Sequence, residues 1–158
     1  MVSAVGWPVV SVMPPLNLNL AGRVFPPGTY LIGREKAREC ARAVRATNSL
    51  HHDVEASRAA GFTDVIEPTT FATVVQSPSV TQLVETPDTG LDPHRIFHGS
   101  EKIEYCRPIV AGEELSTTLT ITDVTERAGS SILSTIARSE MRAATWSSPS
   151  LVAATPRR

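Results

Sequence analysis

The chain has 158 residues, of which 41% are hydrophobic and 20% are charged, and its formal net charge is -1 at pH 7. This composition is that of an ordinary globular domain, and it excludes the strongly basic surface typical of nucleic-acid-binding proteins. The two cysteines, Cys40 and Cys106, have neither metal-binding nor redox spacing and fit a reducing compartment. We therefore expect a cytoplasmic protein without a nucleic-acid partner.

The N-terminal segment, residues 1–15, is apolar but is interrupted by Pro8 and by Pro14-Pro15, and no Lys or Arg precedes Arg23. A secretory signal begins with basic residues, and a membrane span needs roughly 20 apolar residues. Neither is predicted. We expect a mobile tail or an edge segment over residues 1–15, followed by a single domain over residues 16–155.

The next elements are a short strand and two helices. Residues 29–32 are β-prone, and residues 34–46 carry a stripe of small apolar residues at helical spacing: Ala37, Cys40, Ala41 and Val44. A shorter helix is predicted over 53–60, with Asp53 as its N-cap and Gly61 just after its end. The stripe indicates that the first helix packs closely against another element.

A third helix is predicted over residues 69–84, capped by Thr69 or Thr70 and kinked or split at Pro78. It is apolar on more than one face, which is typical of a buried helix. From Arg95 onward the apolar period changes to two, which predicts strands over 95–107, 115–125 and 132–138. Turns are predicted at 109–112 and 128–130, and a weak last strand at 151–152. This segregated order predicts an α+β fold with an antiparallel sheet packed on one helix, and its exposed edge predicts oligomerisation.

Residues 46–62 resemble the motif of the MaoC-like dehydratases and (R)-specific enoyl hydratases, roughly G-D-x-N-P-x-H-x-D followed by a small residue and G-F. Asn48 and His51 stand at the Asn and His positions. The other matching positions are Asp53, Ser57 and Gly61-Phe62. Two positions depart from the motif: Ser49 replaces Pro, and Ala46 stands where the family has its catalytic Asp.

Three further stretches, 33–39, 68–71 and 107–115, are similar to the N-terminal MaoC-type dehydratase domain, and the resemblance covers about residues 16–140. This group includes the HadA-type subunit of mycobacterial (3R)-hydroxyacyl-ACP dehydratases. In those enzymes one subunit lacks the catalytic pair and shapes the acyl channel, while a partner hot-dog subunit supplies Asp and His.

The resemblance implies a hot-dog fold, in which an antiparallel sheet wraps round a central helix. It implies acyl thioesters of CoA or acyl carrier protein as ligands, no cofactor, no metal, and either a homodimer or a heterodimer with a catalytic hot-dog subunit. His51 is the expected acid–base residue. Backbone N–H groups at Thr69, Thr70 and Phe71 are expected to bind the thioester oxygen. Asn48 has two interpretations: it binds the thioester region, or it stabilises the turn.

Ala46 removes the carboxylate, so we expect a substrate-binding subunit that is non-catalytic or weakly active. If it is active alone, it is a hydro-lyase. The alternatives are a non-enzymatic acyl-thioester binding or scaffold protein, and a hot-dog thioesterase. Asp53 is interpreted as a helix cap, with a replacement base as the alternative. His94 and His98 have i, i+4 spacing, but the preceding Pro93 and the β-like pattern argue against a metal site there.

Overall fold

The structure is a computed structural model that describes residues 16–127, 130–141 and 144–156. The tail expected over residues 1–15 lies outside the described residues, and so do two residues of the turn predicted at 128–130. The elements in chain order are β1 (Gly28–Leu31), α1 (Arg34–Ala43), η1 (Ser49–His51), α2 (Val54–Ala59), α3 (Ala72–Glu85), η2 (Pro87–Thr89), η3 (Pro93–Arg95), β2 (Phe97–Glu101), β3 (Glu114–Arg127), β4 (Ser130–Met141) and β5 (Ala144–Pro156).

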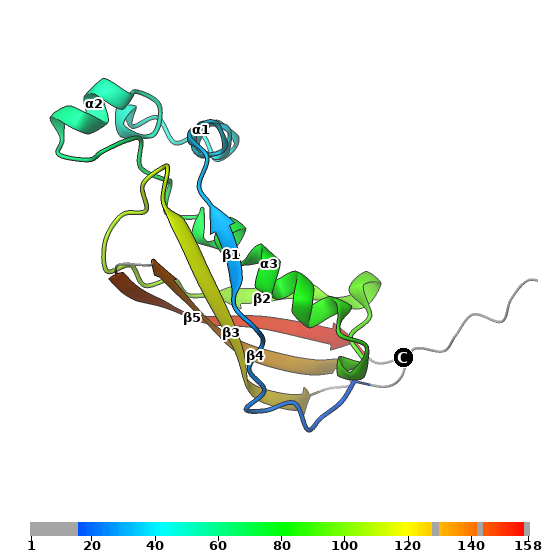
Figure 1. Ribbon diagram of the computed structural model, residues 1–158. Coiled ribbons are helices and arrows are strands. Elements are labelled where there is room, and N and C mark those ends of the chain that lie inside the picture. Colours follow the sequence, from blue (N-terminus) through cyan, green and yellow to red (C-terminus); the bar gives the residue numbers. More distant parts are fainter. Residues whose placement is uncertain (1–15, 128–129, 142–143, 157–158) are drawn as a thin grey trace, which may run out of the picture.

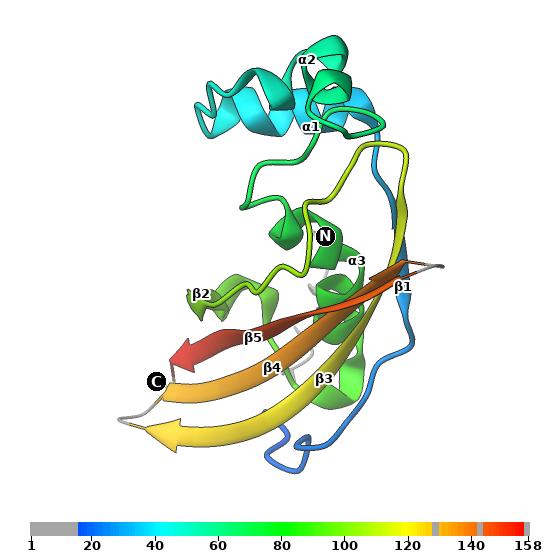
Figure 2. The same cartoon turned by 90° about the vertical axis from the view of Figure 1, so that its left-hand side faces the viewer.

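The strands form one antiparallel sheet in the order β1-β3-β4-β5-β2, which places β1 and β2 at its edges. Burial alternates along β4 with the period of two expected of a strand that has one covered face. Its buried residues on that face include Leu133, Thr135, Ala137 and Ser139. Figure 2 shows β3, β4 and β5 curving together, with α3 on the inner side of the curve. The expected antiparallel sheet wrapped round a central helix is therefore confirmed.

The central helix α3 is continuous through Pro78, so the predicted split does not occur. The Ser79 hydroxyl donates to the Thr117 carbonyl at 2.8 Å and ties the helix to β3. Gly28 of β1 faces the same turn, where a Cβ would lie 3.0 Å from the Pro78 Cβ. The N-cap is Phe71, which makes no side-chain cap hydrogen bond, so the predicted cap at Thr69 or Thr70 is wrong. Burial of the helix replaces the cap as its source of stability.

Helices α1 and α2 lie together at one end of the sheet (Figure 1). Helix α1 buries Ala37 and Ala41 of the predicted stripe. Asp53 is the N-cap of α2, because its Oδ1 accepts a hydrogen bond from the Glu55 N–H at 2.9 Å. Gly61 has a φ of 93°, a left-handed conformation that favours glycine just after a helix. Both predicted helices are confirmed.

Two strand predictions differ from the structure. Strand β2 ends at Glu101, and residues 102–107 run outside any strand, although 95–107 was predicted as one strand. The side chain of Tyr105 explains this course, because its hydroxyl donates to the Thr69 carbonyl and holds the segment against the start of α3. The last strand, β5, is much longer than the predicted 151–152, because its backbone pairs with β4 on one side and with β2 on the other.

Within the described ranges, no helix combines the length and the apolar character that crossing a bilayer requires.

Candidate functional site

A pocket of about 400 Å³ opens between the α1–α2 end of the molecule and the start of α3. Three segments line it. His51 comes from η1, and the stretch leading into α3 contributes Ile66, Glu67 and Thr69. The loop between β2 and β3 contributes five residues: Tyr105, Cys106, Arg107, Pro108 and Ile109. The wall is therefore apolar over part of its area, with one imidazole, one carboxyl group, one phenol and one guanidinium among its side chains.

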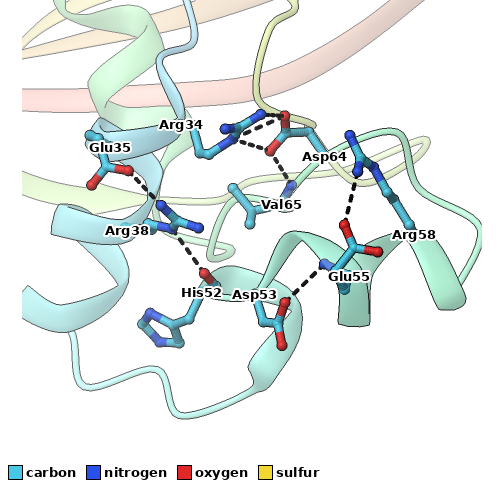
Figure 3. Close-up of polar contacts among 9 residues, drawn as sticks. All are labelled: Arg34, Glu35, Arg38, His52, Asp53, Glu55, Arg58, Asp64 and Val65. Carbon is cyan, nitrogen blue, oxygen red and sulfur yellow. Dashed lines mark hydrogen bonds and ion pairs between the residues drawn. The ribbon is translucent and has the colours of Figure 1, made fainter.

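Two arginines of α1 fix the segments that carry the site (Figure 3). Arg34 binds Asp64 through two donors, Nε at 2.8 Å to Oδ1 and Nη2 at 2.5 Å to Oδ2, and this pair holds the pKa of the Asp64 carboxyl below its usual value. Asp64 Oδ1 also accepts from the Val65 N–H at 2.7 Å. Arg38 Nε donates to the His52 carbonyl at 2.8 Å. The loop before α2 and the stretch before α3 are thus attached to the same helix.

The segment before α3 is extended and held on both sides. On one side, Glu67 N–H donates to the Ile109 carbonyl at 2.9 Å, and Ala111 N–H donates to the Val65 carbonyl at 2.9 Å. On the other side, Ile66 N–H donates to the Leu50 carbonyl at 3.0 Å. These backbone hydrogen bonds fix the positions of both His51 and Glu67 on the pocket wall.

The ring of His51 is oriented by a backbone carbonyl. Its Nδ1 lies 2.9 Å from the Ile66 carbonyl oxygen. Because a carbonyl oxygen only accepts hydrogen bonds, Nδ1 carries the hydrogen in the neutral ring. Nε2 of neutral His51 is therefore unprotonated, which is the state a general base requires.

Glu67 is a buried carboxyl group on the wall of this pocket. The residue is 6% exposed, and neither carboxyl oxygen has a hydrogen-bond partner among the residues that the structure describes. Burial disfavours the charged form and raises the pKa of Glu67 from 4.5 to about 8. At neutral pH the group is therefore mainly a neutral carboxylic acid.

Tyr105 and Arg107 complete the polar part of the wall. The Tyr105 hydroxyl donates to the Thr69 carbonyl at 2.5 Å, and burial raises the pKa of this phenol to about 12. Arg107 Nη1 donates to Glu113 at 2.9 Å, so its charge is paired beside the pocket. Tyr105 thus remains a neutral donor across the physiological pH range.

The structure separates the residues that the sequence analysis grouped as a site. His51 and Thr69 line the pocket, whereas Asn48, Thr70 and Phe71 are not among its lining residues. Asn48 Oδ1 accepts from the Leu50 N–H at 3.0 Å, which is the turn-stabilising interpretation. The Phe71 N–H donates to the Pro68 carbonyl at 2.8 Å, and the Phe71 side chain lies in the core.

Other predicted roles are decided by local contacts. Asp53 caps α2, so its cap interpretation is confirmed. The ring of His52 is half-buried, and its Nε2 lies 2.7 Å from the Ala46 carbonyl oxygen. Within the described ranges, no cluster of three or more His, Cys, Asp or Glu side chains is suited to a metal ion.

Glu67, Tyr105 and Arg107 line the pocket but were not predicted as site residues from the sequence. The available signal for Glu67 was a single acidic residue between Ile66 and Pro68, directly before a predicted buried helix. An acidic residue in an otherwise apolar stretch indicates either a partner or a perturbed pKa. Tyr105 and Arg107 give no such signal, because the alternating pattern over residues 95–107 predicts a strand there.

Comparisons with known proteins identify the family. The model of the family described as "FAS1-like, dehydratase domain region" matches residues 19–143. A UPF0336 protein of Clavibacter michiganensis subsp. michiganensis is 52% identical over 120 residues, which is 75% of this chain and 80% of that protein. Both matches span the whole of the pocket described above.

Solved structures agree on the fold. A MaoC-like dehydratase superposes with a TM-score of 0.77 at 26% identity, covering 88% of this chain and 43% of that longer one. The HadBC (3R-hydroxyacyl-ACP dehydratase) complex of Mycobacterium tuberculosis gives a TM-score of 0.74 at 23% identity, covering 87% of this chain and 96% of the matched chain. The chain therefore belongs to the FAS1-like dehydratase-region family and has the MaoC-like hot-dog fold.

Proposed function

We propose that this chain is an acyl-thioester-binding subunit of a (3R)-hydroxyacyl-thioester dehydratase, or (R)-enoyl hydratase, with weak activity of its own. The observation that carries the proposal is the His51 ring, held by the Ile66 carbonyl on the wall of a pocket in a chain of the dehydratase family. The pocket volume, about 400 Å³, falls in the range of small-molecule sites. The ligand is an acyl thioester of CoA or of acyl carrier protein.

The reaction requires two proton transfers. In hydration, a base takes a proton from water as its oxygen adds to Cβ of the enoyl thioester, and an acid then delivers a proton to Cα. Neutral His51 presents Nε2 for the first transfer. Ala46 offers no carboxylate for the second, and loss of one acid–base group costs on the order of 10²–10⁴-fold in rate. This loss is the reason to expect weak activity.

The proposed assembly is a homodimer, or a heterodimer with a hot-dog subunit that carries the Asp and His pair. Strands β1 and β2 are the edges of the sheet, and an unpaired edge is a surface on which a second chain can pair. The related HadBC structure is itself a complex. We expect this assembly in the cytoplasm, where acyl thioesters of CoA and carrier protein are consumed.

The test is hydration of a short trans-2-enoyl-CoA, followed by loss of the conjugated enoyl absorbance. The purified protein is expected to give slow turnover that His51→Ala lowers by at least about 100-fold. His94→Ala is the matched control, because His94 is an exposed residue of η3 and does not line the pocket. The turnover of the His94→Ala variant is expected to equal that of the unmodified protein.

Two results would contradict the proposal. One is turnover that His51→Ala leaves unchanged. The other is a protein whose melting temperature no acyl-CoA raises, since a bound ligand stabilises the folded state. Melting-temperature increases without turnover, alone or with an Asp/His-bearing partner, would favour a scaffold role over a dehydratase subunit.

A further inference from the structure

The proposed reaction needs a second acid–base group besides His51. Hydration needs a base and an acid, and dehydration needs the same pair in reverse. In this chain the family's Asp position is Ala46, whose carbonyl is occupied by His52. His51 by itself supplies only one of the two groups. A proton donor on the same pocket wall would supply the second group that hydration and dehydration require.

Among the residues that line the pocket, Glu67 is the one that has a carboxyl group. It lines the pocket together with His51, and the two are linked through one residue, because His51 Nδ1 binds the carbonyl of Ile66. Both carboxyl oxygens are shielded from solvent and have no hydrogen-bond partner among the described residues. A buried carboxyl group without a hydrogen-bond partner costs folding free energy even when it is neutral. A structural role does not explain that cost, because Glu67 ties no element to another through its side chain.

The charged and titratable groups around Glu67 do not stabilise its carboxylate form. Cys40 of α1 and Tyr105 of the β2–β3 loop are its electrostatic neighbours, and both are neutral at pH 7 because burial raises the pKa of each. Arg107, on the same wall, is paired with Glu113 instead. Among the described residues, no cation therefore holds Glu67 in its charged form, and burial is the cause of its raised pKa.

We propose that Glu67, as a neutral carboxylic acid, is the second acid–base group of this site and takes over the role that Ala46 cannot fill. The inference rests on the proposed function, since it names the proton donor for that reaction. It assigns the chain's own weak turnover to a pair, His51 and Glu67, that is different from the Asp and His pair of the family motif.

The proton transfers of hydration balance with water, His51 and Glu67 alone. His51 Nε2 takes a proton from water while the water oxygen bonds to Cβ, and the electron pair of the double bond moves towards the thioester carbonyl to form an enolate. The enolate Cα then takes the Glu67 proton. Transfer of a proton from the His51 imidazolium to the Glu67 carboxylate restores both groups. Dehydration runs the same steps in reverse.

The test is the pH dependence of kcat/KM for enoyl-CoA hydration in Glu67→Gln and in the unmodified protein. The amide has nearly the same shape as the acid but no proton to transfer. We expect a loss of about 100-fold or more. We also expect the alkaline limb of the profile, which lies near pH 8 in the unmodified protein, to be absent from the residual activity. Glu104→Gln is the matched control, because Glu104 is exposed and outside the pocket, and it should leave both rate and profile unchanged.

Chemical rescue gives a second measurement that a structural role would not affect. In Glu67→Ala, added acetic acid is expected to raise the hydration rate in proportion to the concentration of its protonated form.

The binding of a saturated acyl-CoA, measured by calorimetry, distinguishes failure of the Glu67 proposal from failure of the proposed function. Full activity and an unchanged alkaline limb in Glu67→Gln would overturn the role of Glu67 while the proposed function stands. Binding without any turnover would also overturn it and leave a binding subunit. Absence of binding in the unmodified protein would overturn the proposed function itself.

Discussion

The free energy of unfolding is expected to fall as the pH rises from about 4.5 to about 8, and Glu67 is the group responsible. Its pKa is 4.5 when exposed and about 8 in the folded protein, so the folded state holds a proton that the unfolded state has lost across this window. Stability falls with pH wherever the folded state binds more protons. The loss begins above pH 4.5 and is complete once the pH passes about 8.

The expected size of this effect follows from about 1.4 kcal/mol per pKa unit. From 4.5 to about 8 this gives a loss on the order of 5 kcal/mol, or ~10–20 °C in melting temperature for a chain of this length. The measurement is the melting temperature at pH 5 and pH 8 for the unmodified protein and for Glu67→Gln. The difference between the two proteins isolates Glu67 from other groups. If the melting temperatures of the unmodified protein and of Glu67→Gln changed in parallel with pH, this result would contradict the buried position of the Glu67 carboxyl group.

Phe71→Ala is expected to lower the free energy of unfolding by about 3–5 kcal/mol. Phe71 is completely buried, begins the central helix and packs edge-on against Tyr30, with the ring centroids 6.0 Å apart. Its removal leaves a cavity at the junction of α3, β1 and the segment that carries Glu67. A single domain has typically 5–15 kcal/mol of stability, so this is a large share.

Urea unfolding measures this loss, with Val44→Ala as the control. Val44 is 48% exposed at the end of α1, and its truncation is expected to change the free energy of unfolding by no more than about 0.5 kcal/mol. Equal effects of the two substitutions would contradict the place of Phe71 in the core. Loss of Phe71 is expected to reduce ligand binding as well, because it loosens the stretch before α3.

The helices and the long strands could be predicted because local patterns determine them. The stripe containing Ala37 and Ala41 marks the buried face of α1, and Asp53 and Gly61 mark the two ends of α2. The alternation along Leu115 and Leu119 marks β3, whose inner face packs on α3. In these segments most of the residues that define the pattern are also buried; Val44, at the end of the predicted stripe, is the exception and is 48% exposed because it lies just after α1 ends.

The errors lie where distant contacts decide the local structure. Residues 102–107 alternate like a strand, but a hydrogen bond from Tyr105 to the start of α3 holds them outside the sheet. The segment 144–156 has little apolar alternation, yet two neighbouring strands bind its backbone. Such pairing depends on long-range topology, which a window of sequence does not contain.

The candidate site was predicted in part for the same reason. His51 was found through the resemblance to the family motif, and the structure places it on the pocket wall. Asn48, from the same motif, stabilises its own turn. Glu67 stands outside the motif altogether, and its chemistry follows from burial, which the sequence around it does not disclose. The motif therefore does not include every ionisable side chain on the pocket wall.

The central claim, that an acyl thioester occupies this pocket, is tested most directly by protection of Cys106 from alkylation. Cys106 is an exposed thiol on the pocket wall, whereas Cys40, on α1, does not line the pocket and serves as the internal reference. Iodoacetamide modification of each cysteine is followed by peptide mass spectrometry, with octanoyl-CoA as the ligand and ADP as the head-group control. We predict that octanoyl-CoA slows modification of Cys106 in a saturable manner and leaves Cys40 unchanged. A Cys106 rate that octanoyl-CoA does not alter would contradict the claim.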